Sequence, residues 1–101
     1  MQLHTLKKVT VVVEDSVKQE LLRKIIEWGA TGYTCHDVQG YGSRGARSDQ
    51  FGSNIEVQVI CSERVADAIL THVSQKYFEN FACIAWTSDV RVVRGAAFGP
   101  P

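Results

Sequence analysis

Residues 9–29 read VTVVVEDSVKQELLRKIIEWG, and within this stretch the spacing of apolar side chains changes from that of a strand to that of a helix. The β-branched residues at its start are typical of a strand that is buried on both faces. From Val17 onwards the apolar residues recur every three or four positions, which places them on one face of a helix. Ser16 and Gln19 have the spacing of a capping box. Gly29 can adopt the left-handed backbone conformation that commonly ends a helix. The stretch therefore predicts a strand followed by a helix with one apolar face.

A second strand and a long loop follow this helix. Residues 32–39 alternate in the manner of a strand, although they are less apolar than the first strand. Residues 40–54, GYGSRGARSDQFGSN, contain four glycines and show no periodicity that could bury a face. A connection of this length in a compact domain is more often functional than structural filler.

The second half of the chain repeats the order of the first. Apolar and polar residues alternate over 55–61, and Ser62 can cap a helix that ends near Tyr77. A last strand is predicted over 82–93, interrupted near 87–89, and the glycines and prolines of the tail beyond it predict irregular structure.

Two βαβ halves joined by a long loop predict an α+β fold, a ferredoxin-like βαββαβ sandwich that forms one domain over residues 1–101. Both helices would cover the same face of an antiparallel four-stranded sheet. Because two helices form only one layer, the other sheet face stays uncovered. An exposed apolar sheet face of this kind predicts self-association into an oligomer.

The composition excludes several classes of function. Eleven basic and eleven acidic residues cancel, so no overall field attracts nucleic acid or an anionic membrane. The strand over 55–61 lacks the aromatic pattern of RNA-binding domains. No apolar run reaches the length of a membrane span and no signal-peptide core is visible, so membrane insertion is not expected and the default location is the cytoplasm.

Histidine and cysteine do not form a metal-binding pattern. They lack CxxC, CxxH and helical i, i+4 spacing, and the cysteines lie in apolar, strand-like contexts. We therefore expect no metal site and interpret the cysteines as reduced packing residues. The six residues are His4, His36, His72, Cys35, Cys61 and Cys83.

The loop begins with GYGSRG at 40–45, which fits the dinucleotide-binding pattern G-x-G-x-x-G. That pattern requires a helix after the glycines, because the helix N-terminus holds the pyrophosphate, and here the next regular element is a strand. Arg44 and Arg47 nevertheless lie three residues apart among glycines and serines, whose backbone amides and hydroxyls can approach an anion. The loop therefore suits phosphate without being a Rossmann turn.

Two stretches resemble the PII signalling proteins. TGYTCHDVQGYG, residues 31–42, matches their pattern T-G-x-T-x-x-x-V-x-G-x-G in front of a long T-loop, which here would span about residues 41–54. GSRGARS at 42–48 and KYFENFACI at 76–84 resemble the PII-like branch, the SbtB and carboxysome-associated PII proteins. The likeness covers nearly the whole chain.

This resemblance implies a homotrimer with an adenine nucleotide in each of three clefts between subunits. The loop would surround the phosphates, which Arg44 and Arg47 would bind. Thr34 would lie near the adenine base. Nothing in the set is a nucleophile with an adjacent base, so the protein is expected to be no enzyme but a switch whose loop responds to nucleotide. The residues that the resemblance assigns to the cleft are Thr34, Gly40, Tyr41, Gly42, Ser43, Arg44, Arg47, Asn80, Phe81, Ala82, Cys83 and Arg94.

The sequence departs from typical PII proteins at two places. QKYFENFA, residues 75–82, lacks the TGxxGDGK-type glycines and phosphate-binding lysine, and Arg44 stands where a glutamine helps to hold magnesium and 2-oxoglutarate. These differences favour AMP, ADP or cyclic AMP as the ligand over an ATP whose phosphates are all bound by the protein. The PII-like branch further implies bicarbonate as a second ligand, and a bicarbonate transporter or carboxysome-related protein of carbon fixation as the regulated partner.

Two alternatives stay open at this point. VQGYGSR at 38–44 resembles the phosphate loop of acylphosphatases, but in that family the loop joins the first strand to the first helix, and here that junction is the acidic EDSV. The second alternative is an interaction module without a small ligand, whose loop would bind only protein.

Overall fold

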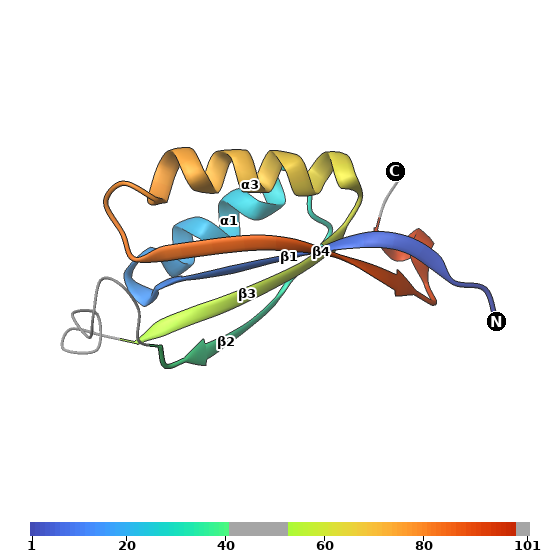
Figure 1. Cartoon of the computed structure of the whole chain (residues 1–101), viewed down its shortest axis with the longest axis horizontal. Coiled ribbons are helices and arrows are strands. Elements are labelled where there is room, and N and C mark those ends of the chain that lie inside the picture. Colours follow the sequence, from blue (N-terminus) through green and yellow to red (C-terminus); the bar gives the residue numbers. More distant parts are fainter. Residues whose placement is uncertain (41–52, 99–101) are drawn as a thin grey trace.

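The computed structural model describes residues 1–40 and 53–98, and it has the predicted order of two βαβ halves (Figure 1). The segments 41–52 and 99–101 lie outside the described residues. The elements are β1 (His4–Glu14), the short 3-10 helix η1 (Asp15–Val17), α1 (Lys18–Glu27), β2 (Thr34–Val38), β3 (Asn54–Cys61), α3 (Glu63–Tyr77), β4 (Cys83–Val92) and the 3-10 helix η2 (Gly95–Phe98). The α+β ferredoxin-like prediction is therefore confirmed.

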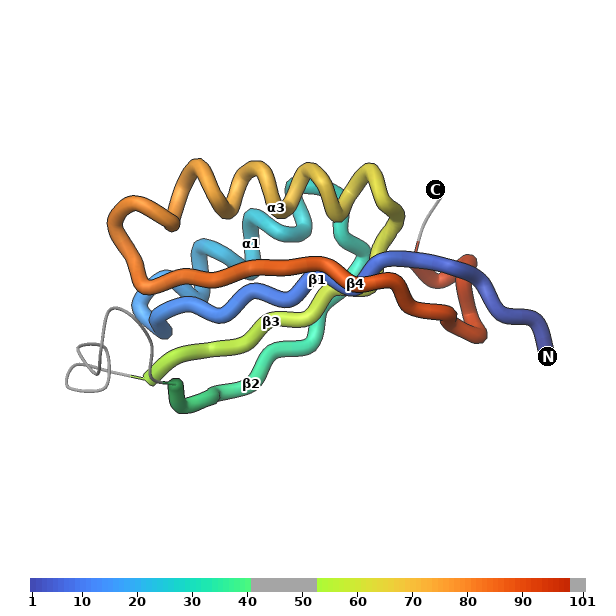
Figure 2. The backbone as a smooth tube through the Cα atoms, in the orientation of Figure 1, coloured from blue at the N-terminus to red at the C-terminus, as the bar shows by residue number. Residues whose placement is uncertain are grey.

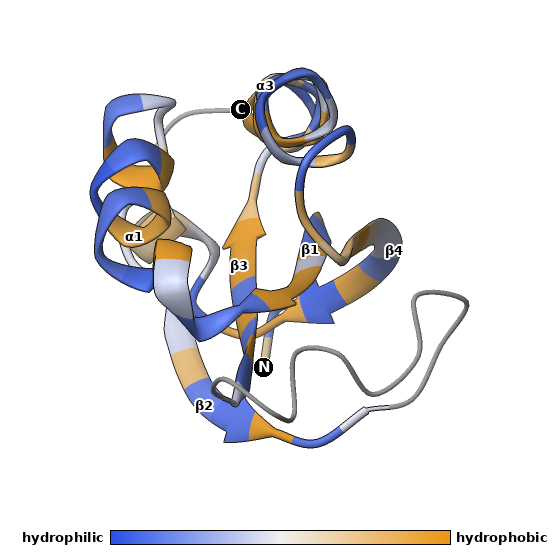
Figure 3. Ribbon diagram, turned by 90° about the vertical axis from the view of Figure 1, so that its left-hand side faces the viewer, coloured by the Kyte–Doolittle hydropathy of each residue, from blue (hydrophilic) through white to orange (hydrophobic). Residues whose placement is uncertain are grey.

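The four strands form one antiparallel sheet in the order β2-β3-β1-β4. The first strand is thus internal and pairs on both sides: Val11 lies opposite Val57 of β3 and opposite Ala85 of β4. The strands β2 and β4 form the two edges. Both helices lie on one face of this sheet, as Figures 1 and 3 show.

The core lies between the sheet and the two helices. It is built from alternate residues of β1 and β3 and from one face of each helix, in agreement with the sequence periodicity. Val12 of β1 points to the other face and is half-buried, so the expectation that this strand is buried on both faces holds only in part. Among the described residues, the hydrophobic side chains with no exposed surface are Val9, Val11, Val13, Leu21, Ile25, Ile55, Val57, Val59, Ile69 and Val73.

Gly29 ends α1 in the left-handed region, with φ of 118°. The Gly29 amide donates to the Ile26 carbonyl and the Ala30 amide to the Ile25 carbonyl, each at 3.1 Å. These two bonds form a Schellman motif, which satisfies carbonyl groups that the helix end leaves free. The predicted stop at Gly29 is confirmed.

The helix starts agree with the sequence in one case and differ in the other. Ser62 caps α3 as predicted, because its hydroxyl accepts the Val65 amide at 3.3 Å. Ser16 does not cap α1: it lies inside η1, and neither η1 nor α1 has a side-chain cap. The 3-10 turn moves the start of the α-helix beyond Ser16, so the predicted capping box is wrong.

Two further expectations about the C-terminal part are wrong. The last strand is continuous from Cys83 to Val92, because β1 pairs with it through Thr87, Ser88 and Asp89 and so supports the polar middle. The tail is also more regular than predicted, since Gly95–Phe98 forms η2. A side-chain hydrogen bond from the Thr31 hydroxyl to the Ala97 carbonyl, 3.3 Å long, contributes to holding it.

The sheet face opposite the helices carries exposed apolar side chains. Ile84 and Trp86 of β4 keep 59% and 44% of their surface exposed. Both lie on the open face, because their partners Val12 and Thr10 alternate with the core valines of β1. This arrangement confirms the predicted uncovered face. Within the described ranges, no helix combines the length and the apolar character that crossing a membrane requires.

We expect Gly29→Ala to lower the free energy of unfolding by about 1–2 kcal/mol, because a side chain in the left-handed region is strained. A Cβ at this position would also lie 3.1 Å from Cγ2 of Val65. Thermal unfolding at fixed protein concentration measures the effect. Gly32→Ala is the matched control, since a Cβ at Gly32 has no neighbour within 4 Å. Equal stability of the two variants would contradict the role of Gly29.

Candidate functional site

Both ends of the segment 41–52 reach one end of the sheet. Val38, the last residue of β2, pairs with Asn54, the first residue of β3. Gly40 lies close by, because a Cβ built on it would be 4.0 Å from the Asn54 amide nitrogen. The Asn54 side chain is buried, so it helps to fix the point where the segment leaves and rejoins the sheet.

The connection between α3 and β4 arrives at the same end. Cys83 begins β4 opposite Val13, one residue before the end of β1. Figures 1 and 2 show this connection, the end of β2 and the start of β3 at one end of the molecule, with the N-terminus and η2 at the other. The structure therefore brings Gly40 and the residues Asn80, Phe81, Ala82 and Cys83 to the same end of the sheet.

The residues 80–83 are anchored to α3. The Phe81 amide donates to the Tyr77 carbonyl at 3.0 Å, and the two rings meet edge to face with centroids 5.9 Å apart. The Tyr77 hydroxyl in turn donates to the Glu20 carboxylate of α1 at 2.9 Å. Asn80 is exposed, whereas Phe81, Ala82 and Cys83 are half-buried. The segment thus has a defined position and still offers surface to a ligand.

This anchor changes the acidity of both partners. The hydrogen bond from Tyr77, aided by Lys76 at 3.6 Å, holds the pKa of the Glu20 carboxyl below its usual value. Burial first, and the bond to Glu20 second, raise the pKa of Tyr77. The hydroxyl therefore remains a donor at neutral pH.

Thr34 and Arg94 lie away from this end. Thr34 is the first residue of β2, exposed on the open face of the sheet opposite Gln58. Arg94 is exposed beyond the end of β4, next to η2. The ten residues of β4 separate Arg94 from Cys83 by roughly 30 Å. Within one subunit, the structure does not bring Arg94 to the ends of the segment 41–52.

Five predicted residues lie outside the described residues: Tyr41, Gly42, Ser43, Arg44 and Arg47. Their role in holding phosphate stays a prediction. The position of Gly40 shows only where the segment that contains them leaves the sheet.

Histidine and cysteine side chains are dispersed over the fold. Among the described residues, no three His, Cys, Asp or Glu side chains form a group that could hold a metal ion. His72 stacks on Trp28 with centroids 4.8 Å apart, and His36 lies 3.6 Å from the Glu56 carboxylate. Burial raises the pKa of the Cys61 and Cys83 thiols to about 11, which favours the unreactive thiol form.

The sequence reasoning missed the contribution of Glu14 and Asp15. The Glu14 carboxylate accepts the Ala82 amide at 3.0 Å, and the Asp15 amide donates to the Ser53 carbonyl at 2.8 Å. The sequence indicates only the acidic character of this junction. No local pattern could have revealed the first contact, because its partners are 68 positions apart in the chain.

Comparison with known proteins gives consistent results. The family model for nitrogen regulatory protein P-II matches residues 6–97. A PII-like signalling protein of Thermus thermophilus is 42% identical, with a TM-score of 0.85 over 97% of this chain and 99% of that chain.

Two more distant structures share the fold. CPII of Thiomonas intermedia K12, a nitrogen regulatory PII-like protein bound to ADP, AMP and bicarbonate, is 24% identical with a TM-score of 0.83 over 96% of each chain. The B. subtilis GlnK-ATP complex is 15% identical with a TM-score of 0.65, over 85% of this chain and 82% of that chain. At these identities the likeness concerns the fold alone.

We expect Tyr77→Phe to raise the pKa of Glu20 toward its usual value, because the substitution removes the main cause of the depression. In the native protein, Glu20 contributes stability above its ordinary pKa and loses that contribution as the pH falls through the lower folded value. An NMR titration of the Glu20 carboxyl carbon measures the change. Lys76→Ala should produce a smaller rise, and an identical titration in wild type and Tyr77→Phe would contradict the assignment.

Proposed function

The chain belongs to the P-II family of nitrogen regulatory proteins, and from that membership we propose that it binds adenine nucleotides in clefts between the subunits of a homotrimer. PII family signalling proteins are non-enzymatic regulators, and this protein is one of them. The nucleotide would set the state of the T-loop, about residues 41–54, which then binds or releases a partner protein. We propose that it acts in the cytoplasm.

The observation that carries this proposal is the meeting of two segments at one end of the sheet. Gly40 and Ser53 mark the ends of the proposed phosphate loop, and residues 80–83 lie at the same end of the sheet. Gly40 follows β2 and residues 80–83 precede β4, which are the two outer strands, whereas Ser53 precedes the internal strand β3. A ligand at this end would therefore contact parts of the chain that only the fold brings together.

The proposed contacts follow the residue types. Gly40, Tyr41, Gly42 and Ser43 would offer backbone amides and a hydroxyl, and Arg44 and Arg47 would pair with phosphate oxygens. Asn80, Phe81, Ala82 and Cys83 would border the cleft at the phosphate end. Thr34, at the start of β2 and so roughly 13 Å from Val38, would lie near the adenine base of an extended nucleotide. Arg94 lies at the far end of its own β4. We therefore propose that the Arg94 that completes the site comes from a neighbouring subunit.

The open sheet face supports an assembly. Ile84 and Trp86 are large apolar side chains on the sheet face opposite to α1 and α3. Burying such side chains favours association by roughly 25 cal/mol for each Å² of apolar surface removed from water. The proposed trimer covers this face and forms the clefts between subunits.

The ligands are proposed from the relatives and from the sequence. The T. intermedia protein is bound to ADP, AMP and bicarbonate and the B. subtilis protein to ATP. The absence of PII-type glycines in residues 75–82 leads us to propose AMP, ADP or cyclic AMP ahead of ATP. Bicarbonate is the proposed second ligand, and a bicarbonate transporter or a carboxysome-related protein of carbon fixation is the proposed partner.

The substitutions Arg44→Ala and Arg47→Ala should each weaken ADP binding about tenfold or more, since a charge-assisted hydrogen bond contributes about 1.5–3 kcal/mol. Isothermal titration calorimetry with AMP, ADP, ATP and cyclic AMP measures the affinities. Arg23→Ala, which removes the same charge from the exposed side of α1, is the control and should bind like wild type. Absence of heat with all four nucleotides would refute the proposed ligand class.

The oligomeric state tests the assembly separately. We expect Ile84→Glu to dissociate the trimer, because it places a charge on the open sheet face. Ile26→Glu is the matched control, since Ile26 is also exposed, at 45%, but lies in α1 on the helical side. Light scattering after gel filtration gives both masses. A monomeric wild type, or a trimeric Ile84→Glu, would contradict the proposed interface.

A further inference from the structure

The junction between β1 and η1 contacts both segments that meet at the candidate site. Glu14 is the last residue of β1, and its carboxylate accepts the backbone amide of Ala82 at 3.0 Å. The next residue, Asp15, donates its own amide to the Ser53 carbonyl at 2.8 Å. Two consecutive residues therefore hold the end of the loop segment on one side and the connection before β4 on the other.

The position of Glu14 explains why its side chain is available for this contact. Glu14 precedes η1 with extended backbone angles, and its side chain makes no cap on that helix. Its carboxylate is directed instead to Ala82. The residue is half-buried, so this charge-assisted hydrogen bond is partly shielded from water and stronger than an exposed one.

Glu14 is also tied to the loop through the sheet. Its Cα partner in the β1–β3 ladder is Asn54, the buried residue that lies next to Gly40. A displacement of the Glu14 backbone would therefore be passed to both ends of the segment 41–52. The same displacement would move the carboxylate that holds Ala82.

The residues around Ala82 are held on two other sides. Phe81 is bonded to Tyr77, and Cys83 enters the sheet opposite Val13. Ala82 lies between these two attachments. The bond to Glu14 ties this part of the connection to the junction between β1 and η1.

From this arrangement we infer that Glu14 is a positioning residue of the nucleotide site, which holds residues 80–83 in register with the ends of the T-loop. This inference rests on the proposed function. Glu14 acts through the Ala82 amide rather than by touching the nucleotide. Asp15 binds Ser53, and Glu14 pairs with Asn54 in the sheet. The same junction therefore links the position of residues 80–83 to that of the ends of the segment 41–52.

Three substitutions at Glu14 separate the effect of side-chain length on ADP binding from the effect of charge. Glu14→Ala removes the acceptor, Glu14→Asp keeps the charge but shortens the side chain by one methylene, and Glu14→Gln keeps the length and a carbonyl acceptor but removes the charge. We expect ADP to bind about tenfold more weakly to the Ala and Asp variants and with an intermediate affinity to the Gln variant, because its amide oxygen keeps the hydrogen bond without the charge. Calorimetry gives the affinities. Hydrogen exchange of the Ala82 amide, measured by NMR without nucleotide, should be faster in the Ala and Asp variants.

Glu27→Ala is the matched control, because it removes the same charge from an exposed carboxylate that pairs with Lys24 at the other end of α1. It should leave both ADP affinity and Ala82 exchange unchanged. Wild-type affinity in Glu14→Ala and Glu14→Asp, or equal losses in Glu14→Gln and Glu14→Ala, would overturn the positioning role.

The exchange measurement separates this inference from the proposed function. If the wild type binds none of AMP, ADP, ATP and cyclic AMP, the proposed function fails, whereas unchanged Ala82 exchange in Glu14→Ala and Glu14→Asp shows that the carboxylate does not hold the segment. If Glu14→Ala does not fold, Glu14→Asp and Glu14→Gln still allow the effect of side-chain length to be compared with the effect of charge.

Discussion

The pairing of β1 with strands on both sides is the constraint on which the rest of the structure depends. Residues Lys7–Glu14 pair with β3 and residues His4–Val13 pair with β4, so the backbone groups of β1 are satisfied along most of its length. Because β1 is internal, the position of its last residue decides where the two chain halves meet. The loop segment and the connection before β4 both reach the sheet next to Glu14.

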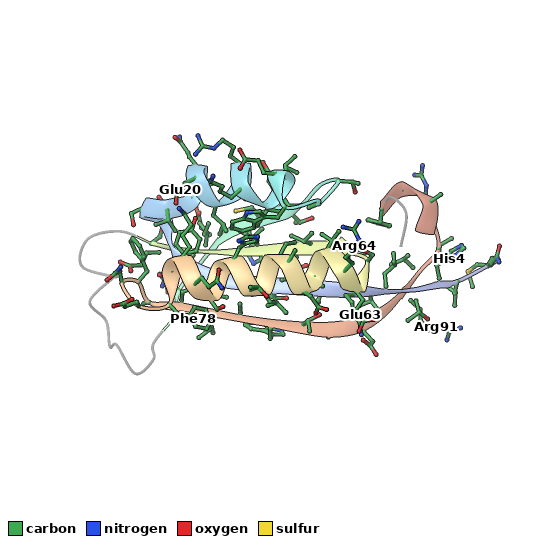
Figure 4. All side chains as sticks on the ribbon, turned by 90° about the horizontal axis from the view of Figure 1, so that it is seen from above. His4, Glu20, Glu63, Arg64, Phe78 and Arg91 are labelled. Carbon is green, nitrogen blue, oxygen red and sulfur yellow. The ribbon has the colours of Figure 1, made fainter. Side chains whose placement is uncertain are left out.

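The single helical layer has a consequence for association. With α1 and α3 on one face, the valines of β1 and β3 are fully buried, whereas Ile84 and Trp86 on the other face are not. Figure 4 shows Glu20 and Phe78 toward one end of the helical layer, with His4 and Arg91 at the other end of the molecule. Because Arg94 and residues 80–83 lie at opposite ends of β4, a site that uses both must include two subunits. The proposed function and the uncovered face thus require the same kind of assembly.

Much of the fold could be predicted because the signals that specify it are local. The alternation of Ile55, Val57 and Val59 and the capping hydroxyl of Ser62 act within a few residues, and both predictions are confirmed. The prediction for Ser16 is wrong because a 3-10 turn and an α-helix start have similar side-chain spacing. The polar residues 87–89 suggested a break in the last strand, but pairing with β1 outweighs the low strand propensity of Asp89.

The sequence by itself determined the two βαβ halves, the apolar face of each helix, the stop at Gly29 and the glycine-rich, arginine-containing stretch that resembles a PII T-loop. Each of these depends on backbone preferences and side-chain periods that operate over a few positions. Only the tertiary structure decided that Ser53 and Ala82 bind Asp15 and Glu14, that Gly40 lies beside Asn54, and that Arg94 lies at the far end of β4. Contacts such as Glu14 to Ala82 join residues far apart in the chain. They arise only after β1 has paired on both sides, because that pairing brings the end of one half against the connection in the other.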